Sequence, residues 1–158
     1  MKKRFLGFVF FLILASPADS QKAGNAVHSS QGAFTFDFAK STPKDLIALL
    51  KANRGTDHSN QVRFLDRAPA GWIKESDIGF LMTVIASSDT VSCFVSPLSS
   101  TACYNCYATL GGHAMEMIEC YRQNTRFPSS FFNCPRTDPQ KVKEITKWRE
   151  TNWRTMKK

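Results

Sequence analysis

The sequence predicts a mainly α-helical fold: a small single-domain bundle of about four helices with a short extended N-terminal segment, stabilised by disulfide bonds. Four segments carry apolar residues at helical spacing, and each begins at a capping residue or a proline. Five cysteines lie between Cys93 and Cys134, in a chain that opens like an exported protein. Setting aside the first 20 of the 158 residues leaves enough chain for one domain with its own core.

The chain begins with the parts of a secretory signal peptide, which we place at residues 1–20. Three basic residues at 2–4 precede an apolar run at 5–15, and the small residues Ala18 and Ser20 mark two alternative cleavage sites. The run is shorter than the roughly 20 residues that cross a bilayer, which favours a cleaved signal over a membrane anchor. The lysine-rich start is typical of bacteria. We therefore expect a periplasmic or secreted protein without a transmembrane segment in the mature chain.

The chain is basic, with a formal net charge of +8. Much of the excess lies after Arg136, where lysine and arginine outnumber the acidic residues. Such an excess favours anionic partners such as acidic proteins, lipid head groups or nucleic acid. Export makes nucleic acid the least expected of these. A solvated basic helix face is the plain alternative.

Two segments are expected after the signal. Residues 21–33 are small and polar and are predicted to be a flexible leader, and residues 34–158 to form the single helical domain. The domain opens with Phe34, Phe36 and Phe38, which alternate with polar residues. Period two with aromatic residues predicts a short extended segment with one buried face.

The first two helices are predicted from their caps. Thr42 is a good N-cap, Pro43 suits the first helical position, and Asp45 favours the positive end of a helix that stops before Gly55. The second helix is expected to begin at Ser76, after which apolar residues recur at helical spacing.

The third helix is expected from about Thr109 to Gln123. It contains Gly111 and Gly112, each of which weakens a helix by about 1 kcal/mol relative to alanine but permits another backbone to approach closely. Phe131 and Phe132 are then expected to anchor a loop in the core. The last helix runs from Asp138 to about Trp153, because Asp138-Pro139 repeats the signal of a cap followed by proline.

The stretch from Trp72 to Trp148 resembles a loose pattern found in uncharacterised exported bacterial proteins, a domain of unknown function. In that pattern, a tryptophan and an acidic helix start precede a serine-rich turn, and a Thr-x-Gly-x-x-Ala segment leads into an Ile-Glu-x-x-Arg helix. The matching residues are Trp72, Asp77, Ser99, Ser100, Thr109, Gly111, Ala114, Ile118, Glu119, Arg122 and Pro128. The resemblance implies a helical exported domain and no particular activity.

All five cysteines are disulfide candidates, because thiols oxidise outside the cytoplasm. A bridge from Cys120 to Cys134 would tie a loop to the third helix, and Cys93 could pair with Cys103 or Cys106. We expect two bridges and one spare thiol. Each bridge would contribute around 2–4 kcal/mol.

Cys103-Tyr-Asn-Cys106 is the one motif that could carry chemistry. In redox enzymes, this spacing places a thiolate at a helix N-terminus and lowers its pKa, so a thiol-disulfide redox protein is the alternative function. Cys103, Cys106, His113 and Cys120 could also bind zinc. However, His113 and Cys120 would lie roughly 10 Å apart along a regular helix. The sequence thus predicts no metal or other cofactor.

Two further groupings are weaker. His113 and Glu116 are spaced by three and could meet as an acid–base pair or as an ordinary solvated pair. A basic and aromatic surface, for docking or core packing, is predicted from Lys141, Lys147, Trp148, Arg149 and Trp153. No catalytic constellation stands out. The leading interpretation is therefore a protein that binds another protein, with inhibitor and immunity proteins as one subclass.

Overall fold

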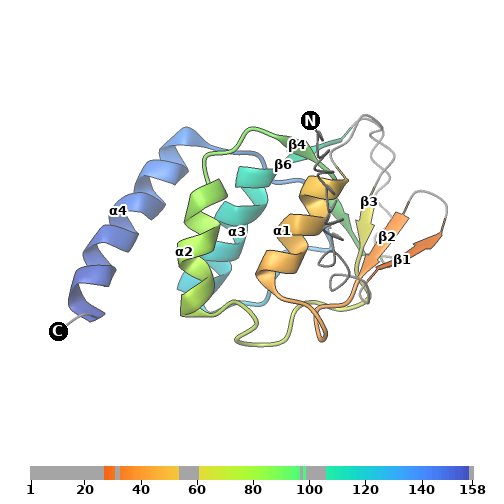
Figure 1. Ribbon diagram of the computed structural model, residues 1–158, viewed down its shortest axis with the longest axis horizontal. Helices are drawn as coiled ribbons and strands as arrows, with labels where there is room; N and C mark the ends of the chain where they lie inside the picture. The colour runs from red at the N-terminus through yellow and green to blue at the C-terminus, as the bar shows by residue number, and fades with distance from the viewer. Residues whose placement is uncertain (1–26, 31–32, 54–60, 97, 99–105, 157–158) are drawn as a thin grey trace, which may run out of the picture.

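The computed structural model describes residues 27–30, 33–53, 61–96, 98 and 106–156, without the side chains of 27–34 and 153–156 (Figure 1). The predicted signal peptide, Cys103 and the serine-rich turn at 99–100 lie outside the described residues. The described elements, in chain order, are β1 (Val27–Ser30), β2 (Ala33–Phe36), α1 (Pro43–Ala52), β3 (Gln61–Arg63), α2 (Glu75–Val84), β4 (Thr90–Val91), β5 (Phe94–Val95), β6 (Ala108–Thr109), α3 (Leu110–Arg122), β7 (Phe132–Asn133) and α4 (Pro139–Met156).

The prediction of a mainly α-helical bundle is wrong. The four expected helices are present, but they accompany a mixed sheet with the strand order β1-β2-β3-β5-β7 and a two-stranded sheet of β4 and β6. β1 also falls within the segment that was predicted to be a flexible leader, where it pairs with β2. The extended segment predicted around Phe34 to Phe38 is present in part as β2, with Phe36 buried. The other strands escaped prediction because most have only two or three residues, too few to show a period of two.

The central strands run parallel and the outer ones antiparallel. β2 pairs parallel with β3, and β3 pairs parallel with β5, while β1 and β7 pair antiparallel at the two edges. Each parallel connection passes through a helix, α1 between β2 and β3 and α2 between β3 and β5, as parallel pairing requires. In Figure 1, α1, α2 and α3 lie together between the strands and α4, which lies at the end farthest from the sheet.

Local signals explain where the helices begin. α1 starts as predicted, because the Thr42 hydroxyl accepts from the Asp45 amide at 3.3 Å and the Asp45 carboxylate accepts from the Thr42 amide at 2.8 Å. α2 begins one residue before Ser76, and Asp77 accepts from the Lys74 amide at 2.9 Å. α3 begins next to Thr109, its predicted start and observed N-cap, and α4 begins next to Asp138, its predicted cap.

An aromatic cluster joins the sheet to the loops around it. Phe38 meets Trp72 edge-on at 5.0 Å, and Trp72 stacks on Phe127 at 5.9 Å. The Trp72 indole N–H donates to the Ser41 carbonyl at 2.7 Å, which satisfies its polar end inside the core. Phe127 in turn meets Phe94 of β5 edge-on at 5.6 Å. These contacts hold the segment around Phe127 against the sheet.

The two glycines of α3 permit the close packing that the sequence predicts. A Cβ atom at Gly111 would lie 2.6 Å from the Ser87 carbonyl oxygen, and one at Gly112 would lie 2.8 Å from the Arg136 amide nitrogen. Real Cβ atoms essentially never come this near to backbone. The start of α3 is therefore fixed between the end of α2 and the segment that leads into α4.

Candidate binding site at the carboxyl edge of the sheet

One edge of the sheet collects the ends of several strands. The parallel strands β2, β3 and β5 end there at Phe36, Arg63 and Val95, and β7 begins there at Phe132 because it runs antiparallel to β5. In open sheets with parallel strands, ligands bind outside the carboxyl ends of the strands. We use the name carboxyl-edge surface for the side chains that follow or precede these ends, namely Asp37, Leu65, Asp66, Arg67, Leu98, Arg126 and Phe131.

The carboxyl-edge surface includes three exposed apolar side chains. Leu65, Leu98 and Phe131 are 78%, 81% and 52% exposed, and they are the exposed large hydrophobic side chains within the described part of the chain. Leu65 follows β3, Leu98 follows β5, and Phe131 precedes β7. The Ser96 amide donates to the Phe131 carbonyl at 2.7 Å, which holds the last two segments together. A gathering of exposed apolar side chains marks an interaction site more often than scattered ones do.

A pocket of about 500 Å³ opens at Leu65. Phe36 and Phe38, which are buried in the core, contribute apolar lining, and Leu65 contributes its exposed side chain. Its charged lining consists of Asp37, Asp66, Arg67 and Arg126. Its size lies within the range of ordinary ligand pockets, and an apolar pocket with a few polar groups is the usual character of a binding site.

Both acidic side chains that line the pocket form ion pairs. Asp37 pairs with Lys40 at 3.3 Å, and the Ala39 amide donates to its carboxylate at 2.9 Å. The Ala39 amide, followed by Lys40, lowers the pKa of Asp37 below its usual value. Asp66 pairs with Arg126 at 3.4 Å. These carboxylates are therefore engaged by neighbours in the same chain.

Arg67 differs from the other charged groups of the pocket. Its guanidinium lies over the Phe131 ring, with the central carbon 5.1 Å from the ring centroid. Its Nε is buried and has no hydrogen-bond partner within the described protein. No ion pair of Arg67 is found among the described residues either. A guanidinium that rests on an aromatic ring and forms no ion pair within its own protein is a natural binding group for a carboxylate.

Arg126 holds the site in shape. Its Nε donates to the Ala68 carbonyl and its Nη2 to the Arg67 carbonyl, both at 2.8 Å. The Ala68 amide donates to the Phe127 carbonyl at 2.7 Å. The segment after β3 and the segment before β7 are thus tied together, so Arg67 and Phe131 are positioned by the same set of bonds.

Glu116 of α3 binds Ser129, in the segment before β7. Its Oε1 accepts from the Ser129 amide at 2.8 Å and from the Ser129 hydroxyl at 2.7 Å, and burial raises the pKa of its carboxyl group. The predicted meeting of His113 with Glu116 does not form, since His113 bonds to the Ser92 carbonyl instead. The Oε2 of Glu116 and the Nδ2 of Asn133 are buried without a hydrogen bond of standard geometry in the described protein, although Asn133 lies near enough to lower the pKa of Glu116.

The disulfide framework differs from the predicted pairing. Cys93 is bonded to Cys134, 41 residues away, and joins the segment before β5 to the residue after β7. The Cys120–Cys134 bridge is absent, because Cys120 is a free buried thiol. A bridge from Cys93 to Cys103 or Cys106 is absent, because Cys93 is bonded to Cys134. The prediction favoured cysteines that are close in the sequence, whereas the two bonded cysteines meet because β5 and β7 are neighbours in the sheet.

The states of Cys106 and His113 bear on the alternative zinc and redox chemistry. Cys106 is half-buried and disulfide-bonded, so it is not available as a thiolate of the zinc site that was considered with His113 and Cys120. His113 is fully buried, and burial lowers its pKa to about 4. A redox role of Cys103 and Cys106 stays a prediction. Cys106 precedes β6, after which α3 begins at Leu110.

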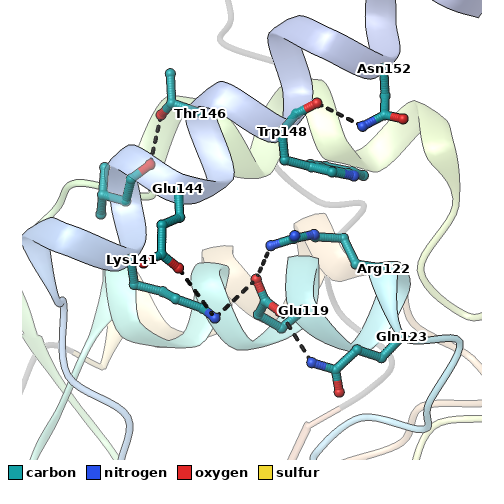
Figure 2. A network of polar contacts seen from close by, with 9 residues as sticks. Glu119, Arg122, Gln123, Lys141, Glu144, Thr146, Trp148 and Asn152 are labelled. Atoms are coloured by element: carbon teal, nitrogen blue, oxygen red, sulfur yellow. Dashed lines mark hydrogen bonds and ion pairs between the residues drawn. The ribbon is translucent and has the colours of Figure 1, made fainter.

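The predicted basic and aromatic surface is divided between two environments. Figure 2 shows Lys141 and Trp148 of α4 turned toward α3. Lys141 lies 3.6 Å from the Glu119 carboxylate, and the Arg122 guanidinium lies over the Trp148 ring at 5.0 Å. Arg122 also pairs with Glu119.

The other three members of that surface are placed differently. Lys147 is exposed, Arg149 is half-buried, and the side chain of Trp153 lies outside the described part. On α4, Ile145 is fully buried. The helix thus docks on α3 through Ile145, Trp148 and Lys141, and docking of its outer face on a partner stays a prediction.

No protein-family model, curated protein or solved structure matches this chain. Among the described helices, none combines the length and apolar character that crossing a bilayer requires. This finding and the Cys93–Cys134 disulfide are compatible with a periplasmic or extracellular location.

Sequence reasoning missed the carboxyl-edge surface. Phe131 was expected to be a buried loop anchor, but it is 52% exposed, whereas its neighbour Phe132 is half-buried in β7. Leu65, Arg67 and Arg126 belong to no motif. They share only their position near a short apolar run, and the strand order is needed to show that these runs end at the same edge of the sheet.

Proposed function

We propose that this protein is an exported, disulfide-stabilised protein that acts by binding another protein through the carboxyl-edge surface. The observation that carries the proposal is that three exposed apolar side chains, Leu65, Leu98 and Phe131, flank neighbouring strand ends, and that Leu65 lines a pocket of about 500 Å³ there. Exposed apolar side chains rimmed by charged ones are typical of protein-interaction sites.

The construction of the site supports binding by a preformed surface. Arg126 and Glu116 fix the segments that carry Arg67 and Phe131, and the Cys93–Cys134 disulfide fixes β5 to β7 beneath them. A surface held in place before binding loses less conformational entropy when the partner docks. Inhibitor and immunity proteins, which need only a complementary surface, are the subclass that fits a small exported domain.

Site-specific photo-crosslinking in the native host tests the proposal. A photoreactive amino acid at position 65, 98 or 131 is expected to form a discrete adduct with another protein. The same residue at position 48, which is exposed on α1, serves as the control. Failure of all three carboxyl-edge positions to give an adduct that the α1 control lacks would refute the proposed function.

The alternative function, a thiol-disulfide redox protein using Cys103 and Cys106, rests on the oxidised state of Cys106. It predicts that the pair is reversibly reduced in a glutathione redox titration, at a potential well above that of a structural disulfide. A pair that stays oxidised throughout the titration would refute this alternative.

A further inference from the structure

The unmatched charge of the carboxyl-edge surface identifies the chemistry of its partner. Lys40 neutralises Asp37 at 3.3 Å, and Arg126 neutralises Asp66 at 3.4 Å. Arg67 forms no such pair within the described residues. The surface therefore presents one positive charge that the described protein does not neutralise, next to an apolar pocket.

Arg67 is held in a conformation that suits a carboxylate. Its own backbone is fixed at both ends, since its amide donates to Asp66 at 2.7 Å and its carbonyl accepts from Arg126 at 2.8 Å. The Phe131 ring lies against its guanidinium. A planar guanidinium fixed in this way loses little side-chain freedom when it forms two parallel hydrogen bonds to a carboxylate.

Glu116 is the internal acid that could have neutralised Arg67. It lies near enough for the charge of Arg67 to lower its pKa, but burial raises that pKa by a larger amount. Its Oε1 is engaged by Ser129, and no ion pair joins it to Arg67. Glu116 therefore interacts with Arg67 without forming an ion pair, so a carboxylate from outside the chain can still pair with Arg67.

We propose that the carboxyl-edge surface binds an acidic segment of the partner protein, with an apolar side chain of that segment in the pocket over Phe36 and Phe38 and a neighbouring carboxylate on Arg67. This inference rests on the proposed function and specifies the partner. The basic character of the whole chain, with a formal net charge of +8, favours the approach of such a segment.

Selection from a displayed library of random short peptides tests the inference on the full chain purified without reductant. Peptides retained by the wild-type protein but not by a Leu65→Asp, Phe131→Asp double variant are expected to carry Asp or Glu next to a large apolar residue. In the same selection, Arg67→Gln should lose the enrichment of acidic residues. Arg63→Gln, which removes the same charge from an exposed position on β3, should keep it.

A binding titration of one enriched acidic peptide and its amide analogue gives the magnitude. Arg67→Gln is expected to weaken the acidic peptide about tenfold, as for a lost charged hydrogen bond, and to leave the amide analogue nearly unchanged. Enriched apolar peptides without acidic residues, or equal weakening by Arg67→Gln and Arg63→Gln, would overturn the acidic partner but keep a binding surface. No enrichment over the double variant would overturn both proposals.

Discussion

The stability of the fold should fall in mild acid because of one buried imidazole. His113 is fully buried on α3, edge-on to Phe94 at 4.7 Å. Its Nε2 lies 3.0 Å from the Ser92 carbonyl oxygen and must donate, since a carbonyl can only accept. Its Nδ1 has no hydrogen-bond partner in the described protein. Burial is the main cause that lowers the pKa of His113 from 6.5 to about 4, so the folded protein holds the ring neutral.

The sign and size of the effect follow from the two pKa values. Above pH 6.5, the imidazole is neutral in both the folded and the unfolded state, and its full contribution to stability is present. Below 6.5, the unfolded chain takes up a proton that the folded chain refuses, so stability falls until the pH reaches the folded pKa of about 4. One pKa unit corresponds to about 1.4 kcal/mol, so the loss amounts to about 3 kcal/mol.

Urea unfolding of the wild-type protein and of His113→Gln, at about pH 7.5 and about pH 4, measures this loss. The glutamine can still donate to Ser92 but does not titrate. We expect the wild-type protein to lose about 3 kcal/mol more than the variant between these pH values. Glu116, whose raised pKa acts in the opposite direction, is present in both proteins and cancels in the comparison. Equal losses in the two proteins would refute a buried neutral histidine.

Three further predictions concern packing and the cysteines. Gly112→Ala should lower the free energy of unfolding by about 1–3 kcal/mol, because its methyl group would overlap backbone. Gly79→Ala in α2, where the atom nearest to the added Cβ is 4.0 Å away, should instead raise the free energy of unfolding by up to about 1 kcal/mol. Similar urea midpoints for the two glycine variants would contradict both predictions. Replacing Cys93 and Cys134 together with alanine should cost about 4 kcal/mol of unfolding free energy, since the bridge closes a loop over 41 residues; an unchanged thermal midpoint would contradict this. Cys120 should resist iodoacetamide in the folded protein and react after denaturation without reductant, because it is buried and burial raises its pKa; peptide mapping that finds fast native labelling would contradict this.

The helices could be predicted because their signals are local. Thr42 and Asp45 form a capping box within four residues of chain, and Thr109 caps α3 by accepting from the Gly112 amide at 3.1 Å. Gly111 and Gly112 likewise indicated a close backbone approach. The caps join residues close in sequence, so the pattern of side chains was enough to place the helix starts, whereas the segments that approach the two glycines come from distant parts of the chain.

Apart from β2, the strands and the carboxyl-edge surface could not be predicted because they depend on pairing between distant segments. β5 and β7 have two residues each, and their pairing brings Ser96 to Phe131 and Cys93 to Cys134. No local pattern distinguishes such strands from loops. The wrong fold class and the wrong disulfide pairing have this same cause.

The sequence by itself determined where the helices begin, which of their glycines must stay small, and that an oxidising compartment is expected for the cysteines. The tertiary structure alone decided that the helices accompany a mixed sheet, that Cys93 bonds to Cys134, and that Leu65, Arg67 and Phe131 share one surface. The physical reason is distance along the chain. A cap acts within one turn of helix, whereas a binding surface at a sheet edge exists only after strands from across the chain have paired.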